Sequence, residues 1–176
     1  MTTRPIRLLG DPVLRSPAAA VTAFDAALRD LVRDLFDTLD AEPGRAGLAA
    51  PQLGVAARVF VYGTRAGRGH LVNPQVTARS GGQTGDEGCL SVPGLAFPTP
   101  RALEVTVAGF DERGEPVTVA GSGFLARALQ HECDHLDGVL YVDTLTGDVR
   151  RQALRAVRAA FPRPAAVRPD AARRGL

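Results

Sequence analysis

The sequence predicts an α+β fold in which short strands, mixed or antiparallel, surround one internal helix. An amphipathic helical pattern occupies the N-terminal part of the chain. Several β-branched or alternating segments separated by Gly, Pro and Asn follow it, and a second helical pattern comes after them. The 176 residues fit a single domain, and a hydrophobic fraction of 45% is typical of a globular chain with a buried core.

The first expected helix spans about residues 23–41, where apolar residues recur at the i, i+3, i+4, i+7 spacing of one helical face. Thr22 and Asp25 resemble a capping box at its start. Pro43-Gly44 supplies a stop signal after it. We expect this helix to be part of the core scaffold.

Short strands are expected through the middle of the chain, at residues 58–62, 70–72, 75–78 and 103–110. The segment 111–114 (DERG) resembles a hairpin turn that leads into a further strand over 116–120. A second helix is expected over 123–136, with Ser122 as its N-cap and its end near Gly138. A third helix is expected over 148–160.

The C-terminal residues 162–176, which are rich in Pro, Arg and Ala, are expected to be a disordered tail, so that residues 1–161 form a single catalytic domain. Residues 149–176 carry a net charge of +7, whereas the rest of the chain carries −5. Such a basic segment is typical of polyanion contact and also of a solvated tail. No segment resembles an export signal or a membrane span, so we expect a cytoplasmic protein without membrane association.

The most informative segment for chemistry is HECDH (131–135), on the second expected helix. Residues four positions apart lie about 40° apart on one helical face, so His131 and His135 can bind one metal ion. Glu132 lies near that side and can act as a base. Cys133 points away from both imidazoles and is expected to be a small packing residue.

A catalytic metal site of this kind has three protein ligands and an open position for water. No Glu follows Glu132, and a Tyr stands where longer motifs place a third His. Candidates for the third ligand are therefore Cys89, His70 and a downstream Asp such as Asp143. Cys89 is favoured because it lies in EGCLS (87–91), where the flanking Gly permits close approach to a metal. His70 has no supporting motif and is expected to be an ordinary strand-end or surface histidine.

A third segment, GLAAPQ (47–52), lies in an expected Gly-flanked loop. Its small residues permit close backbone approach, and a buried Gln amide beside a metal can donate to a developing oxyanion. The segments GLAAPQ, EGCLS and HECDH, in this order, resemble the three signature motifs of the peptide deformylases. The resemblance extends from GDPVLR near the N-terminus to HLDG after the third motif.

The resemblance implies metal-dependent hydrolysis that removes the N-formyl group from the N-terminal formylmethionine of newly synthesised proteins and releases formate. It implies that Cys89, His131 and His135 bind the metal. The metal of this family is Fe²⁺, which Zn²⁺, Ni²⁺ or Co²⁺ often replaces. Glu132 would take a proton from the attacking water and deliver it to the leaving amine.

The same resemblance implies that the Gln52 side chain and the Leu90 backbone N–H stabilise the oxyanion. It implies that the backbone of Ala46, Gly47 and Gly88 holds the substrate as an added strand. The methionine side chain would enter an apolar pocket partly lined by the HECDH helix. The expected partners are N-formylmethionyl nascent peptides, and contact between the Arg-rich C-terminus and the ribosome or its RNA is a further hypothesis.

Two positions depart from the family pattern. Arg45 stands where the first motif often begins with Gly, and Ala96 stands where many relatives carry an Arg that contacts the peptide. Two other classes of function stay open at this point. One is a metalloprotease with Asp143 or another Asp as third ligand, and the other is a non-catalytic, metal-stabilised domain. Glu132 and Gln52 argue against the second, because a structural site closes its fourth position with a ligand.

Overall fold

The structure is a computed structural model, and it describes residues 2–162. Its helices are α1 (Ala26–Asp40), α2 (Gly123–Leu136), α3 (Tyr141–Thr144) and α4 (Gly147–Ala160), with short 3-10 helices η1 (Pro12–Arg15) and η2 (Ala50–Leu53). Its strands are β1 (Gly47–Ala49), β2 (Val59–Thr64), β3 (Gly67–Ser80), β4 (Gln83–Cys89), β5 (Val92–Arg101), β6 (Glu104–Phe110) and β7 (Pro116–Ser122).

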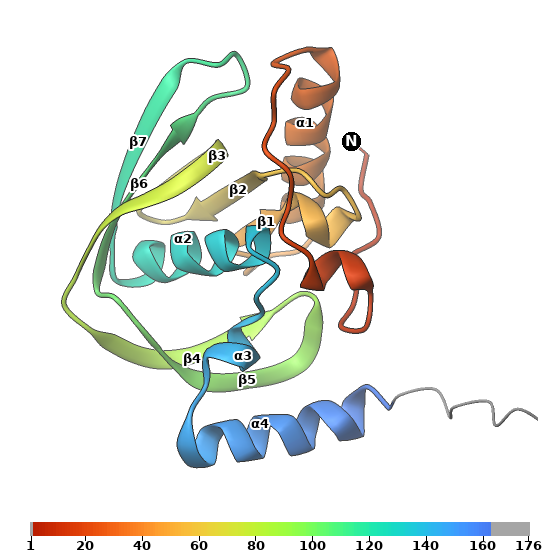
Figure 1. Ribbon diagram of the computed structural model, residues 1–176, viewed down its shortest axis with the longest axis vertical. Coiled ribbons are helices and arrows are strands. Elements are labelled where there is room, and N and C mark those ends of the chain that lie inside the picture. Colours follow the sequence, from red (N-terminus) through yellow and green to blue (C-terminus); the bar gives the residue numbers. More distant parts are fainter. Residues whose placement is uncertain (1, 163–176) are drawn as a thin grey trace, which may run out of the picture.

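Two antiparallel sheets enclose one helix. The larger sheet has the order β1-β2-β3-β6-β7, and β4 pairs with β5 in a separate sheet. Helix α2 lies between the two sheets, and α4 runs along the far side of the smaller one (Figure 1). The predicted α+β fold with an internal HECDH helix is therefore confirmed. Within the described residues, no helix is long and apolar enough to cross a membrane.

Strand β2 is buried on both faces, which explains its continuous apolar sequence. Side chains alternate between the two faces of a strand. Phe60 and Tyr62 accordingly belong to a core cluster with α2, whereas Val59 and Val61 belong to a cluster with α1. Leu129 of α2 is fully buried in the first cluster. The larger sheet thus packs on both helices, and this packing fixes the position of α2.

The first helix is shorter than predicted. It begins at Ala26 because Asp25 is its N-cap, and the Asp25 carboxylate accepts a hydrogen bond from the Leu28 N–H at 3.1 Å. The prediction that Thr22 opens a capping box is therefore wrong. The predicted helices 123–136 and 148–160 correspond to α2 and α4, and their bounds agree to within one residue.

The predicted strands 70–72 and 75–78 are parts of one long strand, β3, which is irregular between them. Asn73 has a positive φ of 50°, and its side chain exchanges two hydrogen bonds with the backbone of Val21. The Asn-Pro pair therefore produces a bulge in a strand rather than the turn that its composition favours.

The segments 47–52 and 83–101, in which no strand was expected, contain β1, η2, β4 and β5. Strand β5 carries three prolines, at positions 93, 98 and 100, and such residues are tolerated at the edge of a sheet. Residues 163–176 lie outside the described part of the chain. The disordered tail and the domain boundary at residue 161 therefore stay predictions.

Candidate metal centre

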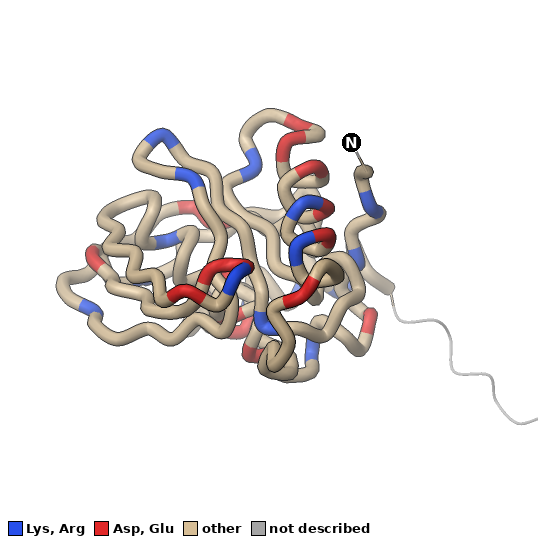
Figure 2. The backbone as a smooth tube through the Cα atoms, turned by 90° about the horizontal axis from the view of Figure 1, so that it is seen from above, with Lys and Arg blue, Asp and Glu red and all other residues tan. Residues whose placement is uncertain are grey.

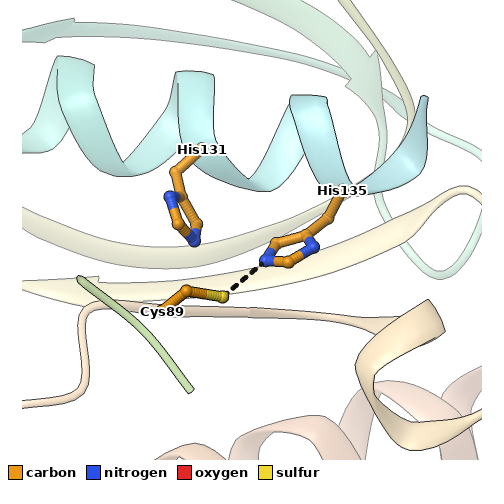
Figure 3. A group of neighbouring side chains, drawn as sticks. All are labelled: Cys89, His131 and His135. Atoms are coloured by element: carbon orange, nitrogen blue, oxygen red, sulfur yellow. Dashed lines mark hydrogen bonds between the residues drawn. The ribbon is translucent and has the colours of Figure 1, made fainter. Parts of the chain in front are cut away.

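Cys89, His131 and His135 meet in one cluster, in which each residue offers a ligand atom within 4.8 Å of the others. Figure 3 shows both imidazoles projecting from successive turns of α2 toward the sulfur of Cys89. The Cys89 Sγ lies 3.2 Å from the His135 Nε2. The structure thus brings together the three residues that were predicted as metal ligands.

The other candidate third ligands are not part of this cluster. His70 lies in β3, and its Nε2 is 2.5 Å from a carboxylate oxygen of Glu112. Asp143 lies in α3, where it accepts from the Leu140 N–H at 2.8 Å and pairs with Arg15. The geometry therefore gives no support to a protease site built on Asp143. Cys133 is buried in the core, as expected of a packing residue.

In the cluster, Cys89 comes from strand β4, and the two histidines come from helix α2. Cys89 is the last residue of β4, at the point where the chain turns into β5. Its sulfur accepts the backbone N–H of Ser91 at 3.4 Å and the Gln52 amide at 3.7 Å. These contacts hold the sulfur in a fixed position between β4 and η2.

A buried ionic network links the two elements. The Glu87 carboxylate accepts a hydrogen bond from His131 Nδ1 at 2.6 Å, which leaves Nε2 of that ring for the cluster. Arg101 of β5 donates to both Glu87 oxygens, at 3.0 and 2.6 Å, and to Asp134 at 2.6 Å. Sequence reasoning assigned no role to Glu87 or Arg101. The sequence did contain a signal for Glu87. It lies two residues before Cys89, and residues at that spacing on a strand share one face, so Glu87 points to the same side as the predicted ligand.

Two neighbouring carboxyl groups, those of Glu87 and Glu132, have very different pKa values. Burial opposes the ionisation of Glu87, but hydrogen bonds from His131 and Arg101 outweigh it and lower its pKa to about 2. Burial raises the pKa of Glu132 to about 7. Glu87 is therefore a permanent anion at neutral pH, whereas Glu132 can both accept and release a proton there.

Glu132 lies in close contact with the backbone of β1. Its side chain is almost fully buried, and within residues 2–162 its Oε2 has no hydrogen-bond partner. A Cβ atom at Gly47 would lie 2.3 Å from the Glu132 Oε1. Only glycine fits at position 47, and the buried carboxylate keeps one oxygen available for a ligand.

Gln52 is held in one orientation beside the cluster. It is 1% exposed, and its Oε1 accepts a hydrogen bond from the Ala49 N–H at 2.9 Å. Because the backbone N–H can only donate, this contact identifies the amide oxygen. The Gln52 Nε2 then lies 3.2 Å from the Ser91 Oγ and 3.7 Å from the Cys89 sulfur. A pre-oriented donor therefore lies at the candidate metal centre.

The cluster opens into a cavity of about 770 Å³. Of the predicted site residues, His135 does not line this cavity, and the following eight do: Ala46, Gly47, Gln52, Gly88, Cys89, Leu90, His131 and Glu132. The wall that α2 contributes was expected to be apolar. It contains Phe124 and Ala128, but Arg127 also lies in it, so that expectation is wrong in part.

The edge of β1 also faces this cavity. The Ala46 carbonyl accepts the Gly63 N–H at 2.9 Å, so the backbone of Ala46 points toward β2. Successive residues of a strand direct their backbone groups to opposite sides, and β1 is the last strand of its sheet. The peptide groups of Gly47, rather than those of Ala46, therefore lie at the free edge.

Two imidazoles and a thiolate that converge beside a buried carboxylate, at the bottom of a cavity, define a metal-dependent hydrolase of the HExxH class. A polypeptide deformylase family model matches residues 3–151 of the chain. The peptide deformylase of Acidothermus cellulolyticus is 56% identical over 160 residues, which cover 91% of this chain and 88% of that protein. That of Parafrankia sp. is 51% identical over 171 residues, covering 94% and 93%.

Solved structures agree with these sequence matches. The peptide deformylase from Thermus thermophilus superposes with a TM-score of 0.84 at 42% identity, covering 89% of this chain and 93% of that chain. The enzyme from Synechococcus elongatus, solved in complex with actinonin, gives 0.80 at 37% identity, covering 88% and 84%. The chain belongs to the polypeptide deformylase family. The predicted activity, hydrolysis of the N-formyl group of N-formylmethionyl polypeptides by a metal-dependent enzyme, is confirmed.

Replacing Arg101 tests the buried network. Arg101→Leu leaves the carboxylates of Glu87 and Asp134 buried without their cationic partner, and the Arg101 side chain is only 7% exposed. We expect the free energy of unfolding to fall by about 3–5 kcal/mol at pH 7. Urea denaturation followed by circular dichroism measures this loss. Arg113→Leu, at an exposed site, is the control and should change it by less than about 0.5 kcal/mol.

Proposed function

We propose that Cys89, His131 and His135 hold the metal of this deformylase, and that Glu132 is its general base. The observation that carries the proposal is the convergence of the three ligand atoms beside a cavity that Cys89, His131 and Glu132 line. The donor set fits a divalent transition metal, because Glu87 occupies the Nδ1 of His131 and leaves its Nε2 for the cluster.

We propose Fe²⁺ as the metal, with Zn²⁺, Ni²⁺ or Co²⁺ able to replace it. Two imidazoles and a thiolate suit all four ions, and family resemblance favours iron. When bound, such an ion acts as a Lewis acid and acidifies a water molecule. The protein supplies the remaining functions from its own side chains and backbone.

Glu132 transfers the proton in this proposal. It takes a proton from the water that attacks the formyl carbon and gives it to the amine as the C–N bond breaks and formate leaves. A pKa of about 7, raised by burial, supports this role, because the same carboxyl group must accept and then release a proton near neutral pH. The partnerless Oε2 supports it too, since no described residue competes for the proton.

Gln52 and Leu90 stabilise the negative charge that develops on the formyl oxygen. The Gln52 Nε2 points toward the Cys89 sulfur and is fixed by the contact of Oε1 with Ala49, so it requires no reorganisation during the reaction. Leu90 follows Cys89 directly and lines the cavity, which supports this role for its backbone N–H.

The nascent peptide binds as an extended strand along Gly47 and Gly88. Gly47 lies at the free edge of β1, and Gly88 lines the opposite side of the cavity in β4. An extended segment between them would gain backbone hydrogen bonds from both. We do not assign the Ala46 carbonyl to the peptide, because it already accepts a hydrogen bond from Gly63.

We further propose that α4 contacts ribosomal RNA, and that the enzyme acts in the cytoplasm, where formylated chains are synthesised. Val149, Ala153 and Val157 pack α4 on the core, and three arginines lie on the exposed side of the helix: Arg151, Arg155 and Arg158. Arg150 differs, because it donates to the carbonyl groups of Asp143 and Leu145. It therefore stabilises the α3–α4 connection.

Glu132→Gln tests the general base. The amide has the size of the carboxylate but cannot take a proton, so we expect kcat for a formyl-Met peptide to fall at least about 100-fold. The bound metal content should not change, because Glu132 is not a ligand. Formate release and metal analysis measure the two effects. Near wild-type turnover would contradict the assignment.

Cys89→Ala tests the ligand set. Loss of the thiolate should lower the metal content or the affinity for Zn²⁺ at least about tenfold, measured by competition with a chelator under anaerobic conditions. Cys133→Ala is the matched control, since this cysteine is buried in the core, and it should keep full metal content. Equal affinities of Cys89→Ala and wild type would exclude Cys89 as a ligand.

Replacement of Arg151, Arg155 and Arg158 by Ala tests the ribosome contact. Binding to RNA phosphates releases counterions, so cosedimentation of the triple variant with ribosomes should be weaker at low salt and less dependent on salt. Formate release from a dipeptide should stay unchanged. Helix α1, where acidic and basic residues alternate (Figure 2), offers the control variant Arg29→Ala/Arg33→Ala. Identical salt dependence of the triple variant and wild type would contradict the contact.

A further inference from the structure

Arg127 is a charged residue in the wall of the catalytic cavity, and the assigned mechanism gives it no role. The cavity face of α2 presents Phe124, Arg127, Ala128 and His131, at the i, i+3, i+4, i+7 spacing of one helical stripe, together with Glu132. The Arg127 side chain is only 11% exposed. An arginine buried this far in a substrate cavity requires partners.

Part of the guanidinium is bound to β4. The Arg127 Nη2 donates to the carbonyl groups of Gly85 and Asp86, and it lies 3.9 Å from a Glu87 carboxylate oxygen. Within residues 2–162, the structure gives no hydrogen-bond partner to Nε or Nη1 of Arg127. Two of its nitrogen atoms are therefore free to donate to a ligand.

The residue opposite Arg127 is a glycine, and this makes room for the guanidinium. A Cβ atom at Gly85 would lie 2.3 Å from the Arg127 Nη1. Gly85 does not have a positive φ, so its backbone conformation does not require glycine. In its present position, the Arg127 guanidinium therefore occupies the space that a side chain at position 85 would take.

The distance from the metal centre identifies the part of the substrate that meets Arg127. His131 lies four residues further along α2, which corresponds to about 6 Å along the helix axis. If the formyl carbon lies at the metal, the sulfur of the first side chain lies five bonds away and its end six bonds away, a comparable reach. Arg127 is therefore placed beside the end of the first side chain of the peptide.

The charges around Arg127 restrict what it can bind. The cavity is lined by four acidic residues, Glu42, Asp86, Glu87 and Glu132, and by two arginines, Arg45 and Arg127, so its lining disfavours a substrate carboxylate. A neutral group with a strong acceptor oxygen avoids this repulsion and satisfies the free donors. The thioether of methionine is only a weak acceptor, whereas the sulfoxide oxygen of oxidised methionine is a polar one.

We propose that Arg127 determines specificity for the first side chain and allows this enzyme to deformylate peptides that begin with N-formylmethionine sulfoxide. The proposal rests on the deformylase function proposed above and on the formyl group binding at the Cys–His–His cluster. The hydrolysis itself is unchanged: water adds to the formyl carbon, the C–N bond breaks, and the methionine sulfoxide side chain is not altered.

The test compares formyl-Met-Ala-Ser with its methionine sulfoxide analogue on the metal-loaded enzyme, by formate release. The wild type should process the sulfoxide with kcat/KM within about tenfold of that for methionine. In Arg127→Leu, kcat/KM for the sulfoxide should fall about 10- to 100-fold, the range expected for loss of a charged hydrogen bond, and mainly through KM. The value for methionine should fall less than the value for the sulfoxide, so that the ratio of the two decreases.

Further variants separate recognition from folding. Gly85→Ala keeps the arginine but places a methyl group against Nη1, so it should lower the sulfoxide-to-methionine ratio without removing charge. In the Arg127→Leu background, Gly85→Ala should have no further effect on this ratio. Arg127→Lys, which keeps a cationic donor, should restore part of it, and the exposed control Arg113→Leu should leave it unchanged.

Two results would overturn the proposal while leaving the deformylase function intact. One is that the wild-type enzyme deformylates the methionine peptide readily but does not deformylate the sulfoxide peptide. The other is an equal decrease for both substrates in Arg127→Leu, which would make Arg127 only a structural link between α2 and β4. Absence of formate from both substrates with the metal-loaded wild type would instead contradict the proposed function.

Discussion

The carboxylate of Glu87 joins the two elements on which the catalytic centre is built. It lies on β4, two residues before Cys89, and it binds the ring of His131 on α2 and the guanidinium of Arg101 on β5. An ion pair of this kind gains little net stability over an apolar core, but it fixes a specific arrangement, and here that arrangement sets the distance between a thiolate and two imidazoles. The side chain of Asp134, which lies two residues after Glu132, completes the pairing of Arg101.

Sequence patterns predicted the elements whose formation depends on residues that are close together in the chain. The helix 123–136 was predicted to the residue, because Ser122 and Gly138 mark its two ends. The small sheet was not predicted, because β4 is rich in Gly and β5 in Pro, and only the pairing of the two strands offsets those unfavourable preferences. Asn73 was misjudged for a similar reason: a turn former was accommodated within a long strand.

For the site, motif spacing identified the three residues that the structure brings together as a candidate metal centre, but not the residues that support them. The i, i+4 spacing is sufficient to place His131 and His135 together, because one helix carries both. The partnership of Glu87 with Arg101 connects residues fourteen positions apart across a strand pair that local pattern did not reveal. The contact between Gly47 and Glu132 is likewise a tertiary constraint, in which a glycine in one motif is required by a carboxylate in another.

The free edge of β1 has a consequence for timing. A backbone that pairs along Gly47 must offer its own N–H and C=O groups, and a segment already built into a helix or a sheet has none to offer. If the peptide binds along Gly47 as proposed, the cleft competes with the folding of its substrate, because the N-terminus of a new protein then enters only while it is still extended. Chains whose first residues fold rapidly have a short interval for processing, and those whose first residues stay extended have a long one.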